Sequence, residues 1–258
     1  MFHLNSILLL SLWDMIKNKR KTVNLCIIKD QKFKMIRDGD IAKILFSEQH
    51  LIPFKKSFEY SSLDLFFNSI HPGDVVLDIG ANVGVYSLLA SKKIGAQGKI
   101  YAFEPTAATF ELLTKNLTLN HCENVVPVKK ALSDSKQRIL MKVPEKWERK
   151  DTDAFNKMVF VSDQEGGEDV MMTETLDDFF ISENIQRVDF IKVDIEGAEY
   201  LFFKGAKNVL SKHKPRILFE SNEMHCKSFQ NSVIDVLVYL NNLGYKLEQI
   251  NQDQWFAK

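Results

Sequence analysis

The residues with the clearest chemical potential are acids that end short apolar runs. Asp78, Glu104, Asp194 and Glu220 each fall at such an end. If the runs are parallel strands of one sheet, the four side chains meet at its carboxyl edge. There they repel one another unless a cation, hydrogen-bond donors or water satisfy them. Because ligands of open α/β sheets bind beyond this edge, the sequence indicates a ligand site there.

A turn rich in glycine accompanies the first acid and reads D-x-G-x-N-x-G from Asp78 to Gly84. Glycines at 80 and 84 allow a sharp turn and a close ligand approach, and the following helix start supplies free N–H groups for a carboxylate. A dinucleotide site needs G-x-G-x-x-G to hold a pyrophosphate, but Asn82 and Val85 occupy the second and third glycine positions. The turn therefore disfavours NAD and an oxidoreductase. S-adenosylmethionine has no phosphate, so Asn82 suits its methionine part.

Two further positions extend this cofactor hypothesis. Glu104 lies 20 residues beyond Gly84, at the end of the second strand, where an acid accepts hydrogen bonds from both ribose hydroxyls. The adenine would then lie beyond the third strand, near residues 131–134, with Ser133 as the candidate for an edge contact. We therefore expect Asp78, Gly80, Asn82, Gly84, Glu104 and Ser133 to bind S-adenosylmethionine.

Methyl transfer to a hydroxyl requires a group that accepts the hydroxyl proton while the oxygen is held opposite the sulfonium sulfur. Asp194 is the first candidate because it closes the strand beside the cofactor turn, Glu196 is the second, and His225 is the histidine to test. For the two acids the alternative is a helix-start pair favoured by the helix dipole. Lys192 shares a strand face with Asp194 and would pair with it or hold an acidic substrate. Asp194, Glu196 and Glu220 would also suit Mg²⁺, although the histidines show no metal-ligand spacing and no metal-binding residues are predicted.

Five strings resemble the FkbM-type methyltransferase family in content and order. They are D-I-G-A-N-V-G-V-Y-S at 78–87, F-E-P at 103–105, N-L-T-L-N at 116–120, E-T-L-D-D-F at 174–179 and I-K-V-D-I-E-G-A-E at 191–199. The resemblance covers about residues 58–250. It implies a class I methyltransferase fold and methyl transfer to a hydroxyl oxygen of a secondary metabolite or sugar.

Positions of this chain match the family pattern residue by residue. The cofactor-binding motif falls on Asp78, Gly80, Asn82, Gly84 and Glu104, and the segment that faces the transferred methyl falls on Asp194, Glu196, Gly197 and Glu199. Glu59, before the first strand, corresponds to a family acid that closes over the cofactor. Residues 1–50 and 142–170 do not match, and these are the segments where such enzymes select their substrate.

The elements that must position these residues alternate between β-branched runs and helical patterns, which is typical of βαβ units around a parallel sheet. Strands are predicted at 75–79, 99–103, 125–128, 188–193 and 216–219, with a final antiparallel pair at 245–250 and 254–257. Helices are predicted at 83–93, from Thr106 or Thr109 to about 120, at 175–180, from 197 through 210, and at 233–243. This is a doubly wound, mostly parallel sheet of seven strands with an N-terminal extension.

The chain divides into an accessory segment, 1–57, of helical or extended structure and a Rossmann-like domain, 58–258. The apolar stretch from Ile7 to Ile16 contains Ser11 and Asp14 and falls short of the roughly 20 residues that span a bilayer. We read it as an amphipathic helix, neither a transmembrane segment nor a signal peptide. Residues 142–168 are mostly polar and predict an excursion with a hairpin around 158–161.

The composition of the chain limits the classes of partner that we expect it to bind. Lys plus Arg and Asp plus Glu both total 34, so no net charge draws the chain to nucleic acid. Three cysteines without a pairing pattern predict a reducing compartment, the cytoplasm. The expected function is methylation of a hydroxyl on a small molecule, sugar or glycan. The alternatives are a module that binds S-adenosylmethionine without turnover and a methyltransferase that acts on a macromolecule.

Overall fold

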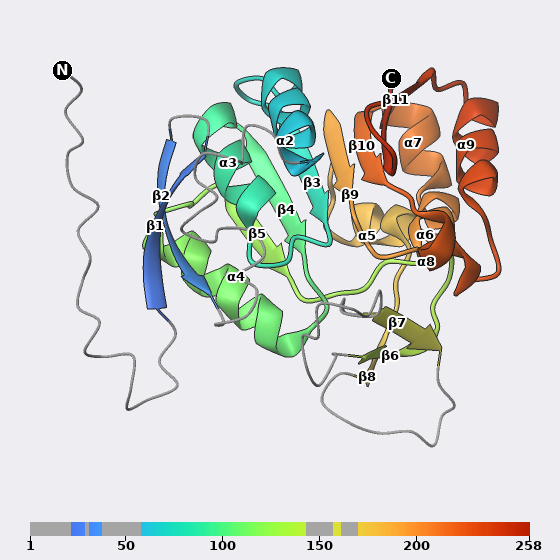
Figure 1. The fold of residues 1–258 in the computed structure, drawn as a ribbon, viewed down its shortest axis with the longest axis horizontal. Coiled ribbons are helices and arrows are strands. Elements are labelled where there is room, and N and C mark those ends of the chain that lie inside the picture. Colours follow the sequence, from blue (N-terminus) through green and yellow to red (C-terminus); the bar gives the residue numbers. More distant parts are fainter. Residues whose placement is uncertain (1–21, 29–30, 38–57, 143–156, 161–169) are drawn as a thin grey trace.

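A computed structural model describes the backbone of residues 22–28, 31–37, 58–142, 157–160 and 170–258 (Figure 1). Side chains are described for 61–141 and 170–258. The predicted helix at 7–16 lies outside these residues. Among the helices of the described part, none is long and apolar enough to cross a membrane.

The centre of the fold is a seven-stranded sheet in the order β11-β12-β10-β9-β3-β4-β5. All its neighbouring strands pair in parallel except β12, which runs antiparallel to both β10 and β11. The strands are β3 (Val75–Ile79), β4 (Lys99–Phe103), β5 (Val125–Val128), β9 (Phe190–Val193), β10 (Arg216–Glu220), β11 (Leu247–Gln249) and β12 (Gln254–Ala257). The strand order reverses between β3 and β9, which is where open α/β sheets bind ligands.

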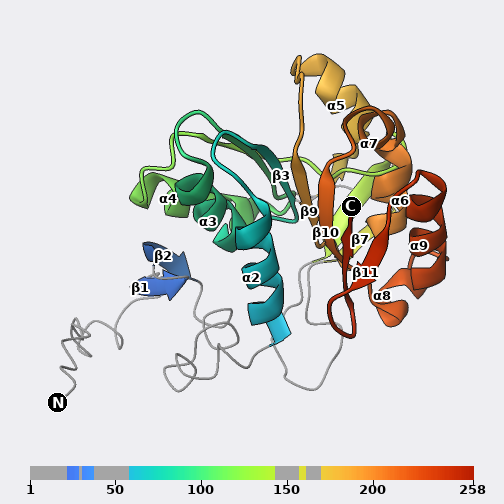
Figure 2. The ribbon, with the colours of Figure 1, turned by 90° about the horizontal axis from the view of Figure 1, so that it is seen from above.

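Helices cover both faces of this sheet (Figure 2). One face carries α2 (Phe58–Ser69), α3 (Val85–Ile94) and α4 (Ala107–Leu119). The other carries α5 (Leu176–Ser182), α6 (Glu199–Gly205), α7 (Lys207–His213) and α9 (Val233–Asn242). Each layer buries its own apolar cluster, with Phe66 and Leu88 in the first and Phe179 and Phe202 in the second. The doubly wound fold predicted from the sequence is therefore confirmed.

Two smaller sheets flank this domain. β1 (Thr22–Ile28) and β2 (Gln31–Arg37) form an antiparallel pair, and β2 lies against α4 (Figure 1). β6 (Arg138–Lys142) pairs antiparallel with both β7 (Lys157–Phe160) and β8 (Val170–Met172). The sequence predicted a hairpin around 158–161; the structure has β7 at this place, paired antiparallel with β6.

Further differences from the sequence prediction lie in the helices, among which α2 was not predicted. The helix expected from 197 through 210 is wrong, because it is divided into α6 and α7 at Ala206. The division follows Gly205, where a Cβ would come within 2.0 Å of the Ser133 carbonyl oxygen. A short helix that the pattern did not predict, α8 (Glu223–Lys227), begins after Asn222, whose side chain accepts a hydrogen bond from the Met224 N–H.

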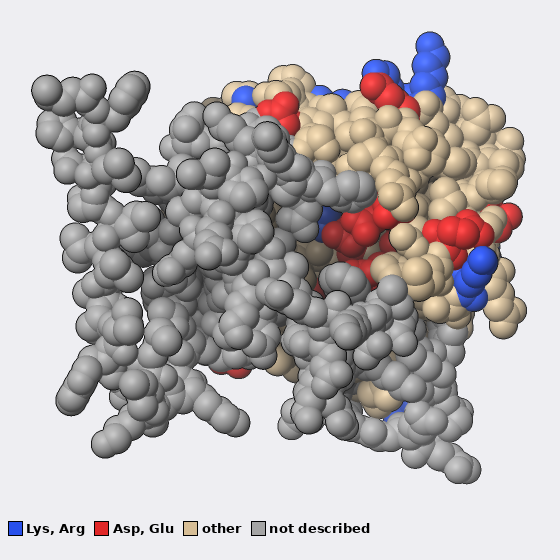
Figure 3. All heavy atoms as spheres, viewed as in Figure 1, with Lys and Arg blue, Asp and Glu red and all other residues tan. Residues whose placement is uncertain are grey.

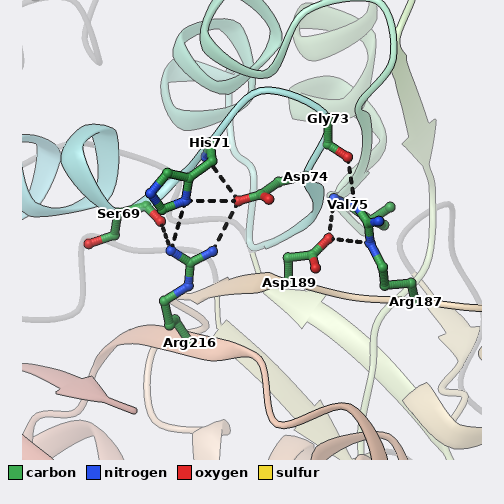
Figure 4. A network of polar contacts seen from close by, with 8 residues as sticks. All are labelled: Ser69, His71, Gly73, Asp74, Val75, Arg187, Asp189 and Arg216. Atoms are coloured by element: carbon green, nitrogen blue, oxygen red, sulfur yellow. Dashed lines mark hydrogen bonds and ion pairs between the residues drawn. The ribbon is translucent and has the colours of Figure 1, made fainter.

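Two arginines tie together the amino ends of the central strands (Figure 4). Arg216, which begins β10, donates to Asp74 Oδ2 at 3.0 Å and to the Ser69 carbonyl oxygen. Arg187 donates to Asp189 Oδ2 at 2.7 Å, and the same carboxyl oxygen accepts the first backbone N–H of β3 at 2.7 Å. These contacts lie at the opposite end of the strands from the predicted ligand site.

Candidate active site

The turn after β3 is folded tightly against the neighbouring strands. The N–H groups of Gly80 and Ala81 donate to the Phe103 carbonyl oxygen at 3.0 and 2.8 Å. Gly80 has φ +77°, and a Cβ there would lie 1.9 Å from the Asp194 carbonyl oxygen. Glycine is required at 80 because the loop after β9 comes this close, so the sequence brings the cofactor turn and the candidate base together through their backbones.

Glu104 fixes the other side of the turn. Its Oε2 accepts the Asn82 N–H at 3.1 Å, and its Oε1 accepts the Thr106 N–H at 3.0 Å. The side chain is 6% exposed, and burial raises its pKa to about 7 against the lowering effect of the Thr106 and Asn82 hydrogen bonds. Asn82 itself is exposed and adopts φ +50°. The acid at the end of the second strand therefore lies directly beside the glycine turn, as the spacing predicted.

A buried ammonium group joins the ends of β3 and β9. Lys192 Nζ lies 3.4 Å from Asp194 Oδ2 and 3.8 Å from Asp78 Oδ1, and it donates to the Gly80 carbonyl oxygen at 3.1 Å. Burial favours its neutral form, but the carboxylates of Asp194 and Asp78 outweigh burial and raise its pKa. The pairing of Lys192 with Asp194 predicted from the shared strand face is confirmed. Tyr86 lies beneath the ammonium group, 4.9 Å from Nζ to the ring centroid.

Asp78 points into the protein. It is 1% exposed, accepts a 2.6 Å hydrogen bond from Ser87 Oγ, and has its pKa raised by burial, which the charge of Lys192 opposes. In the described structure its carboxylate contacts Ser87 and Lys192, so it supports the turn from the protein interior.

The loop between β9 and α6 has a specific shape. Glu196 adopts φ +56° and Gly197 φ +103°, and a Cβ on Gly197 would lie 2.4 Å from the His225 carbonyl carbon and oxygen. Glu199 is 1% exposed, and its Oε1 accepts the N–H groups of Ile195 and Gly197 at 3.1 and 3.2 Å. The family pattern placed Glu199 in the segment that faces the methyl group; the structure turns its side chain inward, where it caps the loop.

The second and third candidate bases form a pair. His225 Nδ1 lies 2.9 Å from Glu196 Oε2, and both side chains are largely buried. Burial raises the pKa of Glu196, the His225 contact lowers it, and the charge of Asp194 raises it further. Asp194, Glu196 and His225 are therefore brought to one place, although His225 comes from α8, which the sequence pattern did not predict.

Asp194 borders a small hollow over the carboxyl ends of β9 and β10, and acidic side chains gather in the middle of this face of the molecule (Figure 3). Its lining includes Tyr86, Lys192, Asp194, Phe219, Glu220 and Gln254. Burial raises the pKa of Glu220 to about 8, and the charges of Asp194 and Glu196 raise it as well. Gln254 Nε2 donates to Glu220 Oε2 at 3.5 Å.

Sequence reasoning missed Tyr86 and Gln254. Two signals were available. Tyr86 follows Gly84 by two positions, and Gln254 is a polar residue opening an otherwise apolar strand, where it stands opposite Glu220 in the antiparallel register.

The structure says less about the other predicted site residues, Ser133 and Glu59. Ser133 is fully buried beneath the end of α6, with its carbonyl oxygen against Gly205, so its adenine contact stays a prediction. Glu59 lies in the first turn of α2, and its side chain is outside the described part. Within the ranges that the structure describes, no group of three or more His, Cys, Asp or Glu side chains is arranged to hold a metal, so the Mg²⁺ hypothesis gains no support.

Comparison with known proteins shows the family of the chain. The methyltransferase FkbM domain model matches residues 78–247, and the chain belongs to that family. Hexuronic acid methyltransferase AglP of Haloferax volcanii is 26% identical over 199 residues, which are 77% of this chain and 75% of that protein. Methyltransferase sdnD of Sordaria araneosa is 29% identical over 154 residues, 50% of this chain and 59% of that protein.

The fold is similar to a solved structure of the same family. The crystal structure of methyltransferase FkbM from Methylobacillus flagellatus KT matches with a TM-score of 0.50 and 15% identity, covering 77% of this chain and 53% of that chain. The predicted family, the class I methyltransferase fold and the assignment as a methyltransferase enzyme are thus confirmed. The fold implies S-adenosylmethionine as the methyl donor.

Proposed function

We propose that this chain transfers a methyl group from S-adenosylmethionine to a hydroxyl oxygen of a small molecule, sugar or glycan. The observation that supports the proposal is the contact between the Gly80 turn and the Asp194 loop, because the partly exposed Asp194 carboxylate, which lines the hollow, lies beside a glycine turn that would suit the cofactor. The hexuronic acid in the name of the Haloferax volcanii relative supports a sugar acceptor.

The residues around the turn fit the cofactor. Glu104 has carboxyl oxygens at the strand end where ribose hydroxyls would donate, and α3 begins at Val85 without a side-chain cap. Asn82 is exposed and would bind the methionine part together with the backbone of Gly80 and Gly84. We assign these residues, with Asp78 as their support from below and with Ser133 and Glu59, to cofactor binding.

The proposed reaction requires the protein to position the acceptor oxygen and to remove its proton. When bound, S-adenosylmethionine supplies a methyl on a positive sulfur; the acceptor oxygen forms the new bond to that carbon while the carbon–sulfur bond breaks and its electron pair stays on sulfur. Asp194 accepts the hydroxyl proton as the oxygen attacks, because its carboxylate lines the hollow beside the turn. Lys192 holds Asp194 in place from the buried side.

The Glu196–His225 pair is the second candidate for this role. An imidazole oriented through Nδ1 by a carboxylate, at 2.9 Å here, is a familiar arrangement for a general base. Glu196 would then orient His225, and His225 would accept the proton.

Two properties of the chain support a small acceptor in the cytoplasm. Its formal net charge is zero, which gives no attraction to nucleic acid. Cys122 and Cys226 are free and buried, as expected in a reducing compartment.

Two measurements test the proposed function. Calorimetry should show heat of binding with S-adenosylmethionine or its demethylated product and none with NAD. Incubation with the methyl-labelled cofactor and a cell extract should then transfer label to a small molecule. Binding without any transfer would favour the module that holds the cofactor without turnover, and label on protein or nucleic acid would favour a macromolecular acceptor.

A further inference from the structure

One apolar side chain stands between the two candidate acids of the loop after β9. Asp194 lines the hollow beside Lys192, and Glu196 pairs with His225. Ile195, which separates the two acids in the chain, is half-buried and packs against apolar clusters of the interior. The place that Ile195 takes therefore affects where both acidic side chains lie.

The Ile195 side chain faces the glycine turn after β3. A Cβ on Gly80 would lie 3.2 Å from Ile195 Cγ2, so this methyl group stands directly opposite the glycine. The same Cβ would lie 1.9 Å from the Asp194 carbonyl oxygen. The backbone of the loop and the side chain of Ile195 therefore both rest on the turn that we assign to the cofactor.

Two apolar clusters share the Ile195 side chain. One is the large core cluster that includes Phe202. The other, the β6 cluster, contains Ile139 and Met141 of β6 together with Ala198. Because β6 belongs to the three-stranded sheet, Ile195 lies where the glycine turn, the central sheet and this second sheet meet.

The backbone around Ile195 is fixed on one side by hydrogen bonds. The Ile195 N–H donates to Glu199 Oε1 at 3.1 Å, and the Ile195 carbonyl oxygen accepts the Ala198 N–H at 3.4 Å. The next residue, Glu196, adopts φ +56°, which is uncommon for a residue with a side chain. Branching at Cβ leaves Ile195 few χ1 rotamers, so its packing also restricts the backbone that leads into this turn.

We propose that Ile195 is a positioning residue for methyl transfer: its branched side chain, packed against the Gly80 turn and the β6 cluster, sets where Asp194 and Glu196 lie relative to the cofactor. The inference rests on the proposed methyl transfer at this site. A half-buried isoleucine removes less apolar surface from water than a fully buried one. The shape of this side chain should therefore matter more for the reaction than for stability.

Three substitutions separate the shape of the Ile195 side chain from its size. Ile195→Val keeps both branches at Cβ and loses one methyl group. Ile195→Leu keeps every carbon atom but loses the branch at Cβ, and because it conserves volume the protein should fold. Ile195→Ala loses both branches.

The first readout is the initial rate at which the full chain transfers label from excess methyl-labelled S-adenosylmethionine to a fixed amount of cell extract. The rate should stay within about 2-fold of the parent in Ile195→Val and fall by about 10-fold or more in Ile195→Leu and Ile195→Ala. If Ile195→Leu transfers at the parental rate while Ile195→Val does not, the side chain only fills space and the inference is overturned.

Cofactor affinity is the second readout. The glycine turn is also held from its other side, where the Phe103 carbonyl oxygen accepts the N–H groups of Gly80 and Ala81. Calorimetry with S-adenosylmethionine should therefore show a change of less than about 3-fold in Ile195→Leu, although its transfer rate falls. Equal losses of affinity and rate would show that Ile195 only shapes the cofactor turn, which overturns the inference.

Ile217→Leu is the matched control. Ile217 is fully buried near the amino end of β10 and belongs to the same large core cluster, so this change disturbs the core at least as much as Ile195→Leu does. The transfer rate of Ile217→Leu should nevertheless stay within about 2-fold of the parent, because the change is distant from the site. A comparable loss in both leucine variants would show that transfer responds to core packing in general, against the inference.

The position of the loop can also be measured without an acceptor. The nitrogen NMR shifts of the His225 imidazole report its contact with Glu196, and His225→Gln identifies these signals. The shifts should change in Ile195→Leu and Ile195→Ala and match the parent in Ile195→Val; parental shifts in all three variants overturn the inference. If the chain neither binds the cofactor nor transfers label, the proposed function fails, and the shifts still decide whether Ile195 positions the loop.

Discussion

Lys192 shows how individual residues in this centre depend on one another. A buried ammonium is stable only with partners, and its partners Asp78 and Asp194 lie at the ends of neighbouring strands. Asp78 is almost fully buried, whereas about a third of the Asp194 side chain, 37%, is exposed. The two acids therefore differ: Asp78 balances charge inside the protein, and Asp194, which is partly exposed, is the one that we propose contacts the substrate.

This difference makes Asp194→Asn informative. Asparagine keeps the size of the side chain and an oxygen near Lys192 but cannot accept a proton. We expect turnover to fall by about 10²-fold or more, the contribution of a positioned base, with cofactor affinity nearly unchanged. Steady-state rates and calorimetry on the same preparation measure both quantities.

The Glu196–His225 pair provides the comparison for Asp194. If His225→Ala or Glu196→Gln alone stops turnover while Asp194→Asn loses cofactor binding, the pair is the base and Asp194 holds the cofactor. Parental turnover in all three variants would mean that the proton leaves to solvent and that catalysis rests on positioning.

We propose that Glu104 binds the cofactor and not the acceptor. Glu104→Ala removes the oxygens that would bind the ribose, so cofactor affinity should weaken by roughly 1–3 kcal/mol, the cost of charge-assisted hydrogen bonds left unmade. The same substitution also leaves the Asn82 and Thr106 N–H groups without their acceptor. In Glu104→Gln one acceptor oxygen remains and the other becomes an NH₂ donor, so only one of the two N–H groups keeps its acceptor, and the affinity should lie between those of the parent and Glu104→Ala. Parental affinity in Glu104→Ala contradicts the ribose assignment.

At the scale of elements, the strands and their terminal acids were predictable because buried parallel strands are short β-branched runs with abrupt ends. The glycine turn was predictable too, because its glycines follow directly on the end of a strand and the signal is local in the sequence. The α6–α7 division was not; beside it Gly205 approaches Ser133, and a local pattern cannot show such a contact between distant segments. α8 has five residues, too few for a helical period, and only Asn222 before it signals a start. The meeting of His225 with Glu196 therefore required the structure.

The loop from β9 to α6 gives a prediction at this scale. Glu199 accepts the Ile195 and Gly197 N–H groups through one carboxyl oxygen, and this contact holds the loop that carries Asp194 and Glu196. In Glu199→Ala both N–H groups lose their acceptor, and we expect turnover to fall by about 10-fold or more through misplacement of the loop, with cofactor affinity less affected.

Glu199→Gln is the matched control for this positioning role. Its amide oxygen accepts the same two N–H groups, and because burial raises the pKa of Glu199 to about 7, a large fraction of the side chain is already neutral near neutral pH. Turnover in Glu199→Gln should therefore approach that of the parent. Equal loss in both variants would mean that the carboxyl group acts by its charge and not by capping the loop.

On the scale of the whole molecule, the two ends of the strands perform different tasks. The carboxyl ends carry the turn, the acids and the hollow, while the amino ends carry the Arg216–Asp74 and Arg187–Asp189 contacts (Figure 4). An open sheet separates these ends by the length of its strands. Stability contributed at one end should therefore be independent of ligand binding at the other.

Arg216→Ala tests this separation. The substitution removes the donor to Asp74 Oδ2 and to the Ser69 carbonyl oxygen, and both partners are partly buried. We expect the free energy of unfolding in urea to fall by about 1–3 kcal/mol, with the affinity for S-adenosylmethionine unchanged. Arg187→Ala is the control, because the Arg187 side chain is 56% exposed and its ion pair is screened by water, so the loss should be under about 1 kcal/mol. Weakened cofactor binding in folded Arg216→Ala would show that changes at the amino ends of the strands affect the site. An unchanged free energy of unfolding would show that Arg216 contributes no net stability to the sheet.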